Sequence, residues 1–476
     1  MGRVRELDAD EAAGPDSLAA GSAAGDLVRR SVLVTGLDHE VGLSPWAAAA
    51  VREADLVVGA ARHLAAVPLP PNGPRMVLGP LAPAVDRIGQ EVAAGRRVVV
   101  LASGDPGLFG IVRRLSQAGL PLHVVPAVSS ISLAFARAGL AWDGAAVVSA
   151  HGRDLRPALN ACRALPLVAV LTQPGAGATE LGAGLVGWAR RLLVAENLGA
   201  DGERLTWVSP DEAAHRDWAD PHVVLVLSEP ADPEPAGPEP ADSEDASPAR
   251  AVAGVRVDNQ PAAAPAGGWA LPESAYDHRD SMITKSEVRS WVLASLRPRL
   301  GRLVWDLGAG SGSVGIECAL LGAAVVAVEK DAAGCDLVRD NASRHGVDVR
   351  VVTGTAPQVL ATLPDPDAVF VGGGGLEVVT AVAQRPAQVG PARIVVALAA
   401  VDRVGPVVEI LRRNGFTTDG VQLSASRFSD LPGGSLRLSA TNPVFVVSAE
   451  RGQGWGPADP AGRAGSAGLA HQAGGS

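Results

Sequence analysis

The sequence predicts an α/β protein with two ordered domains, and three observations carry that prediction. A chain of 476 residues is long for a single domain. Apolar residues make up 47% of it but aromatic residues only 3%, so Ala, Val, Leu and Gly must fill the cores, as they do in parallel α/β sheets. Short β-branched runs also alternate with helical segments along most of the chain, which is typical of strand–helix–strand units.

In the N-terminal half this alternation extends from residue 31 to residue 228. Strands are predicted at 31–36, 55–59, 97–102, 122–126, 145–150, 167–172, 191–196, 203–208 and 222–228. Helices are predicted at 45–54, 82–94, 108–118, 129–138, 155–164 and 178–189. Ser44 before Pro45 favours a helix start, because Ser can cap a helix and Pro suits its first turn. We expect one α/β domain in two lobes that divide near residues 140–150.

Three segments lack the apolar residues needed to form a core. Residues 1–30 are acidic and rich in Ala and Gly, which predicts a disordered extension. Seven acidic residues and six prolines lie between positions 229 and 248, so residues 229–268 are predicted to be an extended linker. Residues 451–476 are rich in Gly and Ala and are predicted to be a disordered tail. The second domain is therefore expected at 269–450.

The second domain is expected to begin with a helix and to end with a β-hairpin. Thr284, followed three residues later by Glu287, has the form of a capping box for a helix at 288–296. Strands are predicted at 303–306, 323–328, 348–353, 368–371 and 393–398, with a final pair at 420–426 and 443–448.

A glycine turn separates the strand at 303–306 from a helix at 314–321. Gly308, Gly310 and Gly312 let the backbone pass close to a ligand, and the start of the helix offers free N–H groups. Glu329 ends the next strand about 21 positions after Gly308, where an acid can accept both hydroxyls of an adenosine ribose. A turn that only packs the domain is the alternative interpretation, but acids at both Asp306 and Glu329 favour a ligand.

The spacing of these glycines narrows the choice of ligand. A dinucleotide fingerprint requires a further glycine at position 313, where this chain has Ser313. No pyrophosphate needs to be held, and the pattern suits S-adenosylmethionine (SAM), whose sulfonium and amino acid would lie over the turn. Because methyl transfer depends mainly on proximity and orientation, neither a Ser-His-Asp triad nor a metal site is expected.

Charge and composition disfavour several other classes of protein. A net charge of −10 argues against broad electrostatic binding of nucleic acid. No apolar run reaches the length of about 18 residues that predicts a membrane span, and the N-terminus lacks the order of a signal peptide, so a cytoplasmic protein is expected. Cys162, Cys318 and Cys335 fit neither a disulfide framework nor a zinc site, and Cys318 is expected to be a small buried apolar residue.

Longer motifs carry a resemblance to two known families. The second domain resembles the decarboxylating methyltransferases of the corrin pathway through SMITKSEVR (281–289), WDLGAGSGSVGIECA (305–319), LPDPDAVFVGGGG (363–375) and LRLSATNPVF (436–445). The first domain resembles the tetrapyrrole methylases through LVTGLDHEVGLSPWA (33–47), EADLVVGAARHL (53–64), VVVLASGDPGLFG (98–110) and VPAVSSISLAFARAGLAWD (125–143). The resemblance implies a two-lobed tetrapyrrole methylase domain followed by a Rossmann-like SAM-dependent methyltransferase domain.

The two families in this order imply an enzyme of cobalamin biosynthesis. Such an enzyme would bind two SAM molecules, one per domain, and methylate precorrin-6B at C5 in the first domain and at C15 in the second. The second domain would also release the ring C acetate as carbon dioxide, giving precorrin-8X. The resemblance implies a small-molecule tetrapyrrole as partner and a homo-oligomer, and neither nucleic acid nor a membrane.

In the second domain the resemblance implies a set of SAM contacts. The methionine part would lie over Gly308, Ala309, Gly310, Ser311 and Gly312, Glu329 would hold the ribose, and the backbone of Ala356 would meet the adenine. Thr284 matches a further contact position, and a helix cap is an alternative or additional role for its side chain. Related chains often have Asp where this chain has Thr355, which puts one adenine contact in doubt.

In the first domain the resemblance implies a folded SAM in a cleft between the lobes, held largely by backbone groups. Ser103, Gly104 and Asp105, with Leu108 nearby, would form one wall, and Ser129 and Ser130 another. An ordinary turn is the alternative interpretation of the Gly-Asp-Pro sequence. The loop at residues 36–40 is less glycine-rich than in the family, which makes Gly36 a weaker candidate.

Candidate substrate contacts lie near the late hairpin. Arg427, Arg437 and Asn442 could meet the carboxylates of a tetrapyrrole, and a solvated sheet edge is an equal alternative. His278 and Lys285 are weaker candidates for the proton donor in decarboxylation. Two other functions remain open from the sequence: methylation of a different anionic small molecule, and tetrapyrrole binding without catalysis.

Overall fold

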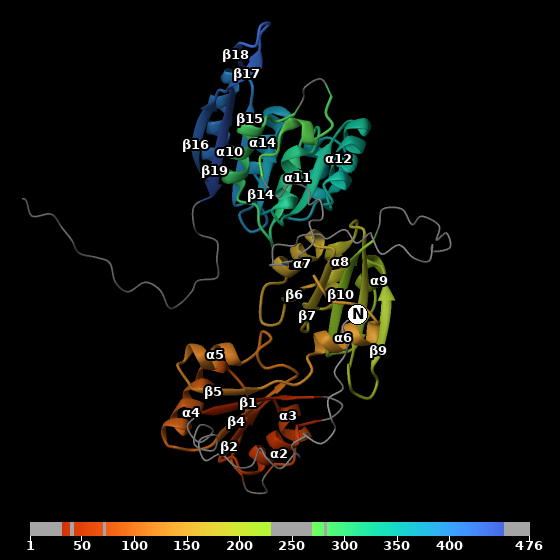
Figure 1. Ribbon diagram of the computed structural model, residues 1–476, viewed down its shortest axis with the longest axis vertical. Coiled ribbons are helices and arrows are strands. Elements are labelled where there is room, and N and C mark those ends of the chain that lie inside the picture. The colour runs from red at the N-terminus through yellow and green to blue at the C-terminus, as the bar shows by residue number, and fades with distance from the viewer. Residues whose placement is uncertain (1–30, 39–41, 70–72, 230–268, 280–282, 452–476) are drawn as a thin grey trace, which may run out of the picture. The chain divides into compact units, whose positions relative to one another are not determined.

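The computed structural model describes residues 31–38, 42–69, 73–229, 269–279 and 283–451, and these form the predicted α/β architecture (Figure 1). They divide into two compact units. The first contains the described residues up to Arg153 together with Leu167–Ala183 and Arg190–Leu227. The second contains Asp154–Pro166, Gly184–Ala189 and the described residues from Ser228 onward. The predicted extension at 1–30, nearly all of the predicted linker (230–268) and the predicted tail from 452 lie outside the described residues.

The first unit begins with a parallel five-stranded sheet in the order β3-β2-β4-β1-β5. Its strands are β1 (Val32–Leu37), β2 (Leu56–Gly59), β3 (Arg75–Val77), β4 (Val98–Ser103) and β5 (Leu122–Val125). Helices α4 (Leu81–Ala93) and α5 (Val112–Gln117) cover one face, and α2 (Pro45–Arg52) and α3 (Ala61–Ala66) the other. Because side chains alternate along a strand, Val32 and Val34 pack against the first pair of helices and Leu33 against the second.

A mixed five-stranded sheet follows in the same unit, in the order β6-β7-β10-β8-β9. Its strands are β6 (Ala146–Ser149), β7 (Leu167–Leu171), β8 (Arg190–Glu196), β9 (Arg204–Val208) and β10 (His222–Ser228). The helices in this stretch of sequence are α6 (Ser130–Ala138), α7 (Leu155–Ala164), α8 (Ala178–Leu185) and α9 (Pro210–Ala214). The chain leaves the first sheet after β5, which ends at Val125, and α6 already packs against the second sheet. The division between lobes therefore falls between Val125 and Ser130, earlier than the predicted residues 140–150.

The second unit is built on a seven-stranded sheet in the order β13-β12-β11-β14-β15-β19-β16. Its strands are β11 (Leu303–Leu307), β12 (Ala324–Glu329), β13 (Arg350–Thr353), β14 (Ala368–Val371), β15 (Arg393–Leu398), β16 (Phe416–Leu423) and β19 (Val444–Arg451). The first five in this order are parallel, and β19 is antiparallel to both β15 and β16. The strand order reverses beside β11, so ligands are expected at the carboxyl ends of β11 and β14.

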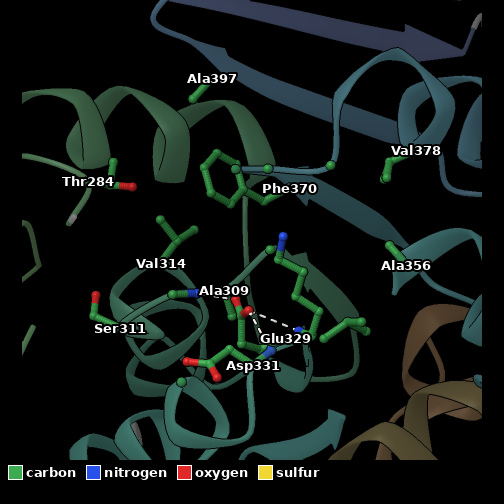
Figure 2. Close-up of a pocket in the computed structure, with 18 of the residues that line it drawn as sticks. Thr284, Ala309, Ser311, Val314, Glu329, Asp331, Ala356, Phe370, Val378 and Ala397 are labelled. Carbon is green, nitrogen blue, oxygen red and sulfur yellow. Dashed lines mark hydrogen bonds between the residues drawn. The ribbon is translucent and has the colours of Figure 1, made fainter. Parts of the chain in front are cut away.

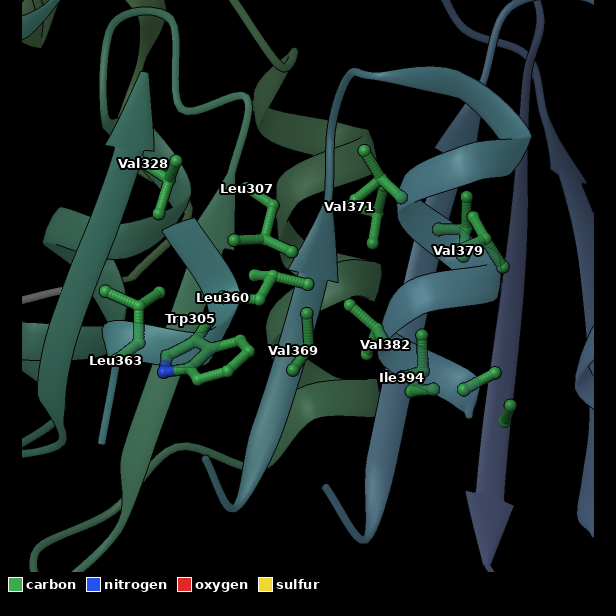
Figure 3. Packing of buried hydrophobic residues seen from close by; sticks show 14 of the residues in the cluster. Trp305, Leu307, Val328, Leu360, Leu363, Val369, Val371, Val379, Val382 and Ile394 are labelled. Atoms are coloured by element: carbon green, nitrogen blue, oxygen red, sulfur yellow. The ribbon is translucent and has the colours of Figure 1, made fainter. Parts of the chain in front are cut away.

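Helices cover both faces of this sheet. On one face, α10 (Ser286–Leu296) and α11 (Ser313–Leu320) pack against Val304 and Phe370, and α12 (Ala332–Arg344) lies beside α11. On the other face, α14 (Gly375–Ala383) and α15 (Val404–Arg413) pack over Trp305, Val369 and their neighbours (Figure 3). The indole N–H of the fully buried Trp305 donates to the Pro364 carbonyl at 3.0 Å, which satisfies its one polar atom. The remaining short helices are α13 (Ala356–Val359), η2 (Glu273–Ala275), η3 (Leu360–Thr362) and η4 (Val401–Arg403).

Several details differ from the sequence prediction. Helix α5 begins at Val112 rather than at 108, because Phe109 has a left-handed φ of 54° that interrupts a helix. The prediction of a capping box at Thr284 is wrong. Lys285 is the N-cap residue of α10 and its side chain makes no cap hydrogen bond, while the Ser286 N–H donates to Glu273 at 2.8 Å. Strands β17 (Ser426–Asp430) and β18 (Leu436–Ala440) form an additional hairpin between β16 and β19.

The Ser44 cap and the burial of Cys318 agree with the prediction. Ser44 caps α2 and accepts the Ala47 N–H at 3.2 Å. All three cysteines are free and buried, and Cys318 is fully enclosed in the core beside α10. In the described part of the chain, no helix combines the length and the apolar character needed to span a bilayer.

Candidate functional site

A cavity of about 990 Å³ lies at the carboxyl ends of β11, β12 and β14 in the second unit. Figure 2 shows Thr284 and Ser311 on one side of it, Ala356 on the other, and Glu329 between them. Every cofactor contact predicted in this unit lines the cavity except Gly312; the lining members are Thr284, Gly308, Ala309, Gly310, Ser311, Glu329 and Ala356. Residues separated by up to 72 positions in the sequence are thus brought to one site, as a topological switch point predicts.

The glycines of the turn are required by its backbone and its neighbours. Gly308, Gly310 and Gly312 have φ of 73°, 58° and 75°, in the region that favours glycine. A Cβ atom at Gly308 would lie 2.9 Å from the Cα of Gly373, so the turns after β11 and β14 touch. A Cβ at Gly312 would instead lie 2.9 Å from Val338 in α12. Gly312 therefore allows α11 and α12 to pack closely and does not face the cavity.

Glu329 is held at the cavity wall by backbone donors. One carboxylate oxygen accepts the Gly310 N–H at 3.0 Å, and the other accepts the N–H groups of Lys330 at 2.9 Å and Asp331 at 3.1 Å. Gly334 provides the room, since a Cβ there would lie 2.8 Å from the Glu329 Cγ atom. A carboxylate has about four lone-pair sites, and three of them are occupied here, so Glu329 can accept about one further hydroxyl donor from a ligand.

Asp306 lies beneath the turn and supports it. Its Oδ2 atom accepts the N–H of Gly315 at 2.8 Å in the first turn of α11. Its Oδ1 atom is buried without a hydrogen-bond partner among the described residues. Burial, with a smaller contribution from the charge of Glu329, raises the pKa of Asp306 to about 7. The carboxyl group is therefore partly protonated near neutral pH.

The predicted substrate contacts do not line this cavity. Arg427 in β17 pairs with Glu273 at 2.7 Å and with Glu287 at 2.7 Å. Arg437 in β18 donates to Ser429 at 3.0 Å, and neither Arg437 nor Asn442 is among the lining residues. These pairings leave Arg427 with two carboxylates already bound, which argues against its prediction as a free substrate anchor.

The sequence did not identify several residues that do line the cavity. Gly372, Gly373 and Gly374 follow β14 and form the wall next to Gly308, and Glu377 lies in the first turn of α14. The glycine run after a strand was a detectable signal, because it has the same form as the turn after β11. Of the two weaker proton-donor candidates, Lys285 lines the cavity and His278 does not.

The structure brings the two predicted walls of the first site together through their backbones. The Gly104 carbonyl accepts the N–H of Ala127 at 3.2 Å, and a Cβ at Gly104 would lie 3.1 Å from the Cα of Ser129. Ser130 follows as the first residue of α6. Close contact at Gly104 therefore joins the end of β4 to the start of α6.

Most of the side chains at these walls have local partners. The Ser103 hydroxyl lies 2.7 Å from Nε2 of His63, and an Asp105 oxygen accepts the N–H of Gly107 at 2.8 Å. Ser129 caps α6 by accepting the Ser132 N–H at 3.0 Å, and Leu108 packs against the apolar cluster of the second sheet. With these side chains engaged, a ligand would meet mainly backbone groups here.

A second cavity, of about 470 Å³, adjoins these walls in the first unit. None of the six predicted residues lines it; its lining residues are Thr35, Gly36, Asp38, Gly42, Ser44, Val125, Pro126, Ala127 and Val128. Gly36 connects the two sites, since a Cβ there would lie 1.9 Å from the Gly104 carbonyl oxygen. Only glycine fits at position 36, although the sequence made it the weaker candidate.

Comparison with known proteins identifies a family for each part of the chain. Residues 33–214 match the family described as tetrapyrrole (corrin/porphyrin) methylases, and residues 274–446 match the precorrin methyltransferase domain. A Sinorhizobium protein described as precorrin-6Y C(5,15)-methyltransferase (decarboxylating) is 38% identical, over 73% of this chain and 79% of its own. A Mycobacterium tuberculosis protein of the same description is 30% identical, over 72% and 80%. A shorter Pyrobaculum calidifontis protein, described as a probable cobalt-precorrin-6B C(15)-methyltransferase (decarboxylating), is 35% identical over 38% of this chain and 94% of its own.

Proposed function

The chain belongs to the family of decarboxylating precorrin-6Y C(5,15)-methyltransferases, and on this basis we propose that it methylates precorrin-6B at C5 and C15 and releases the ring C acetate as carbon dioxide. The product would be precorrin-8X. The observation that carries the proposal is the similarity to the Sinorhizobium protein, because a match over 73% of the chain is longer than either domain and must include parts of both.

In the second unit we assign SAM to the cavity beside the glycine turn. Glu329 and the Ala356 backbone would hold the adenosine, and Gly308 to Ser311 would lie under the methionine part next to Thr284. SAM supplies an electrophilic methyl group, and the protein contributes mainly proximity and orientation. A cavity of about 990 Å³ is at the upper end for ligand sites, which supports binding of the cofactor together with part of a macrocycle.

Decarboxylation at the same site needs an acceptor for the electron pair that the departing carboxylate leaves behind. The conjugated imine system of the tetrapyrrole can accept it, so the protein needs only to orient the acetate and deliver a proton to the remaining carbon. Lys285 lines the cavity and makes no ion pair with any described residue. It is therefore our candidate for the group that faces the acetate.

In the first unit we assign a second SAM to the walls formed by Ser103 to Asp105, Leu108, Ser129 and Ser130, and C5 methylation to the space around Gly36. The close backbone contact at Gly104 supports this assignment. We further propose that the enzyme acts in the cytoplasm as a homo-oligomer. The exposed apolar side chains of Phe428, Leu436 and Leu438 on the β17–β18 hairpin are surfaces that a second copy could cover.

Incubation of the purified protein with precorrin-6B and SAM tests the proposal. We expect release of carbon dioxide and the addition of two methyl groups to the macrocycle. A folded protein that binds SAM but neither methylates nor decarboxylates the macrocycle would contradict it.

A further inference from the structure

Residues 269–279, which we call the strap, are held against the rest of the second unit by hydrogen bonds to a fully buried ion pair. Arg289 in α10 and Glu317 in α11 have no exposed side-chain surface, and their Nε and Oε1 atoms are 2.5 Å apart. Glu317 also accepts two backbone N–H groups of the strap, at 2.5 and 3.0 Å, and the Tyr276 hydroxyl at 3.0 Å. A buried carboxylate with four donors is fully satisfied, so its position is closely defined.

Arg289 extends this network to the cavity. Besides its bond to Glu317, the guanidinium donates to the carbonyl oxygen of Leu271 in the strap and, at 2.5 Å, to that of Thr284. Thr284 lines the cavity beside the glycine turn. The rigid fork of one guanidinium group thus fixes a strap residue and a cavity residue relative to each other.

Asn341 in α12 makes a second link of the same kind. Its side chain is fully buried, accepts the Asp277 N–H at 2.9 Å and donates to the Asp277 carbonyl at 2.9 Å. The same amide nitrogen donates to the carbonyl of Ser311 at 2.9 Å. Ser311 belongs to the glycine turn, so both N–H groups of Asn341 join the strap to the cavity.

The strap also reaches the cavity directly. Arg279, at its end, pairs with Asp331 at 2.8 Å, and both residues line the cavity. Three separate contacts therefore connect the strap to cavity-lining residues, and two of them run through polar side chains without exposure to solvent.

We propose that Arg289 and Asn341 are positioning residues for the methionine end of SAM in the second unit. Each fixes the backbone of one residue, Thr284 or Ser311, that stands beside that end of the ligand. The inference rests on the proposed function, because it takes SAM as the ligand of this cavity. A misplacement of about 1 Å in a binding group can cost about 100-fold in the function that depends on it. A purely structural role would instead lower stability and leave the ligand contacts as they are.

Three substitutions separate these roles. Arg289→Lys keeps the charge beside Glu317 but cannot donate to three acceptors in the geometry of a guanidinium fork. Asn341→Ala removes the link between Asp277 and Ser311 from a different helix, so the test does not depend on one variant folding. Tyr276→Phe is the matched control: it removes a hydrogen bond to Glu317 in the same network without contacting Thr284 or Ser311.

Calorimetric titration of the full chain with two probes provides the test. S-adenosylhomocysteine has the amino-acid end, and 5′-methylthioadenosine lacks it; binding to the second unit is identified as the part that Glu329→Ala removes. We expect Arg289→Lys and Asn341→Ala to bind S-adenosylhomocysteine at least about 10-fold more weakly, with 5′-methylthioadenosine affinity within about twofold of wild type. Tyr276→Phe should bind both probes like wild type despite a lower melting temperature.

Unchanged S-adenosylhomocysteine affinity in both variants would overturn the inference and leave the proposed function intact. Equal weakening of both probes would also overturn it, because the effect would not be confined to the methionine end. If the wild-type protein showed no S-adenosylhomocysteine binding that depends on Glu329, the proposed function and this inference would both fail.

Discussion

At the scale of single residues, the second unit places buried polar groups directly beside its cavity. Asp306, Ser311 and Ser313 are almost without exposure, although all three lie in or next to the glycine turn at the carboxyl end of β11. The sequence identified Asp306 as an acid at the end of a strand. It could not show that one oxygen of this acid has no partner among the described residues, because that depends on how α11 packs over it.

The raised pKa of Asp306 predicts a pH effect on stability. Its pKa is about 7 in the folded protein and near 3.8 when exposed, so between these values the folded state binds more protons than the unfolded state. The free energy of unfolding should therefore fall as the pH rises from about 4 to about 7. Asp306→Asn removes this titration, so relative to wild type the variant should be more stable at pH 8 than at pH 5. Thermal unfolding at the two pH values measures the difference, and the same relative stability at both would show that Asp306 does not titrate in this range.

Gly308 should be intolerant of any side chain. Gly308→Ala combines a positive φ with a contact of 2.9 Å to Gly373, so we expect a loss of about 1 kcal/mol or more and strongly weakened S-adenosylhomocysteine binding. Gly375→Ala is the matched control, because Gly375 has the same φ of 73° but open space around its Cβ position. Titration calorimetry and thermal unfolding compare the two. Equal ligand affinity in both variants would contradict the close approach of the two turns as the cause.

At the scale of elements, the sequence predicted the helices and strands that a local apolar pattern marks. It missed the features that depend on contacts between distant residues. Central strands of the parallel sheets, such as β4 and β11, are largely buried, so they appear as continuous apolar runs and were located to within a few residues. The short parallel strand β3 was missed, because Arg75 and Val77 are exposed and no buried run marks it. The β17–β18 hairpin was missed because its residues are exposed, with Phe428 at 75% and Leu438 at 65%, and no core imposes a pattern on them. Likewise, the glycine turn and Glu329 were recognisable from their spacing, whereas Asn341 reaches the site only through folding.

Arg427 joins three elements: β17, the strap and α10. Its guanidinium is the main reason that the pKa of Glu273 is lowered from 4.5 to about 2. Because the folded protein favours the ionised Glu273 carboxylate, this group stabilises the folded state fully above about pH 4.5. That stabilisation is lost as the pH falls toward 2. Wild type should therefore be more stable than Glu273→Gln at pH 6, and the difference should shrink as the pH falls below about 4.5 and disappear below about pH 2. Scanning calorimetry over this range tests the prediction, and a difference that did not depend on pH would exclude an ionic origin.

At the scale of the whole molecule, the proposed function requires two unlike cofactor sites, one in each of the two compact units. One is a glycine turn at the switch point of a parallel sheet, and the other consists mainly of backbone groups around Gly104. The first could be located from local spacing. The second could be inferred only from resemblance, because no short motif specifies a site that backbone groups form.

If each unit holds one cofactor site, as proposed, each chain should bind two cofactor molecules. Titration of the full chain should give a stoichiometry of about two S-adenosylhomocysteine molecules for wild type. Glu329→Ala, which removes the proposed ribose acceptor, should reduce it to about one. Asp336→Ala changes an exposed acid on α12 and should leave it unchanged. A stoichiometry of one in the wild-type protein would contradict a separate site in each unit.

The most direct test of the two-site account is mass spectrometry of the product that Glu329→Ala forms from precorrin-6B with excess SAM, beside wild type and Asp336→Ala. Wild type and Asp336→Ala should give a product with two added methyl groups and without one carboxyl group. Glu329→Ala should give a product that carries the C5 methyl group and lacks the C15 methyl group. Equal loss of both methylations in a folded Glu329→Ala protein would contradict the account.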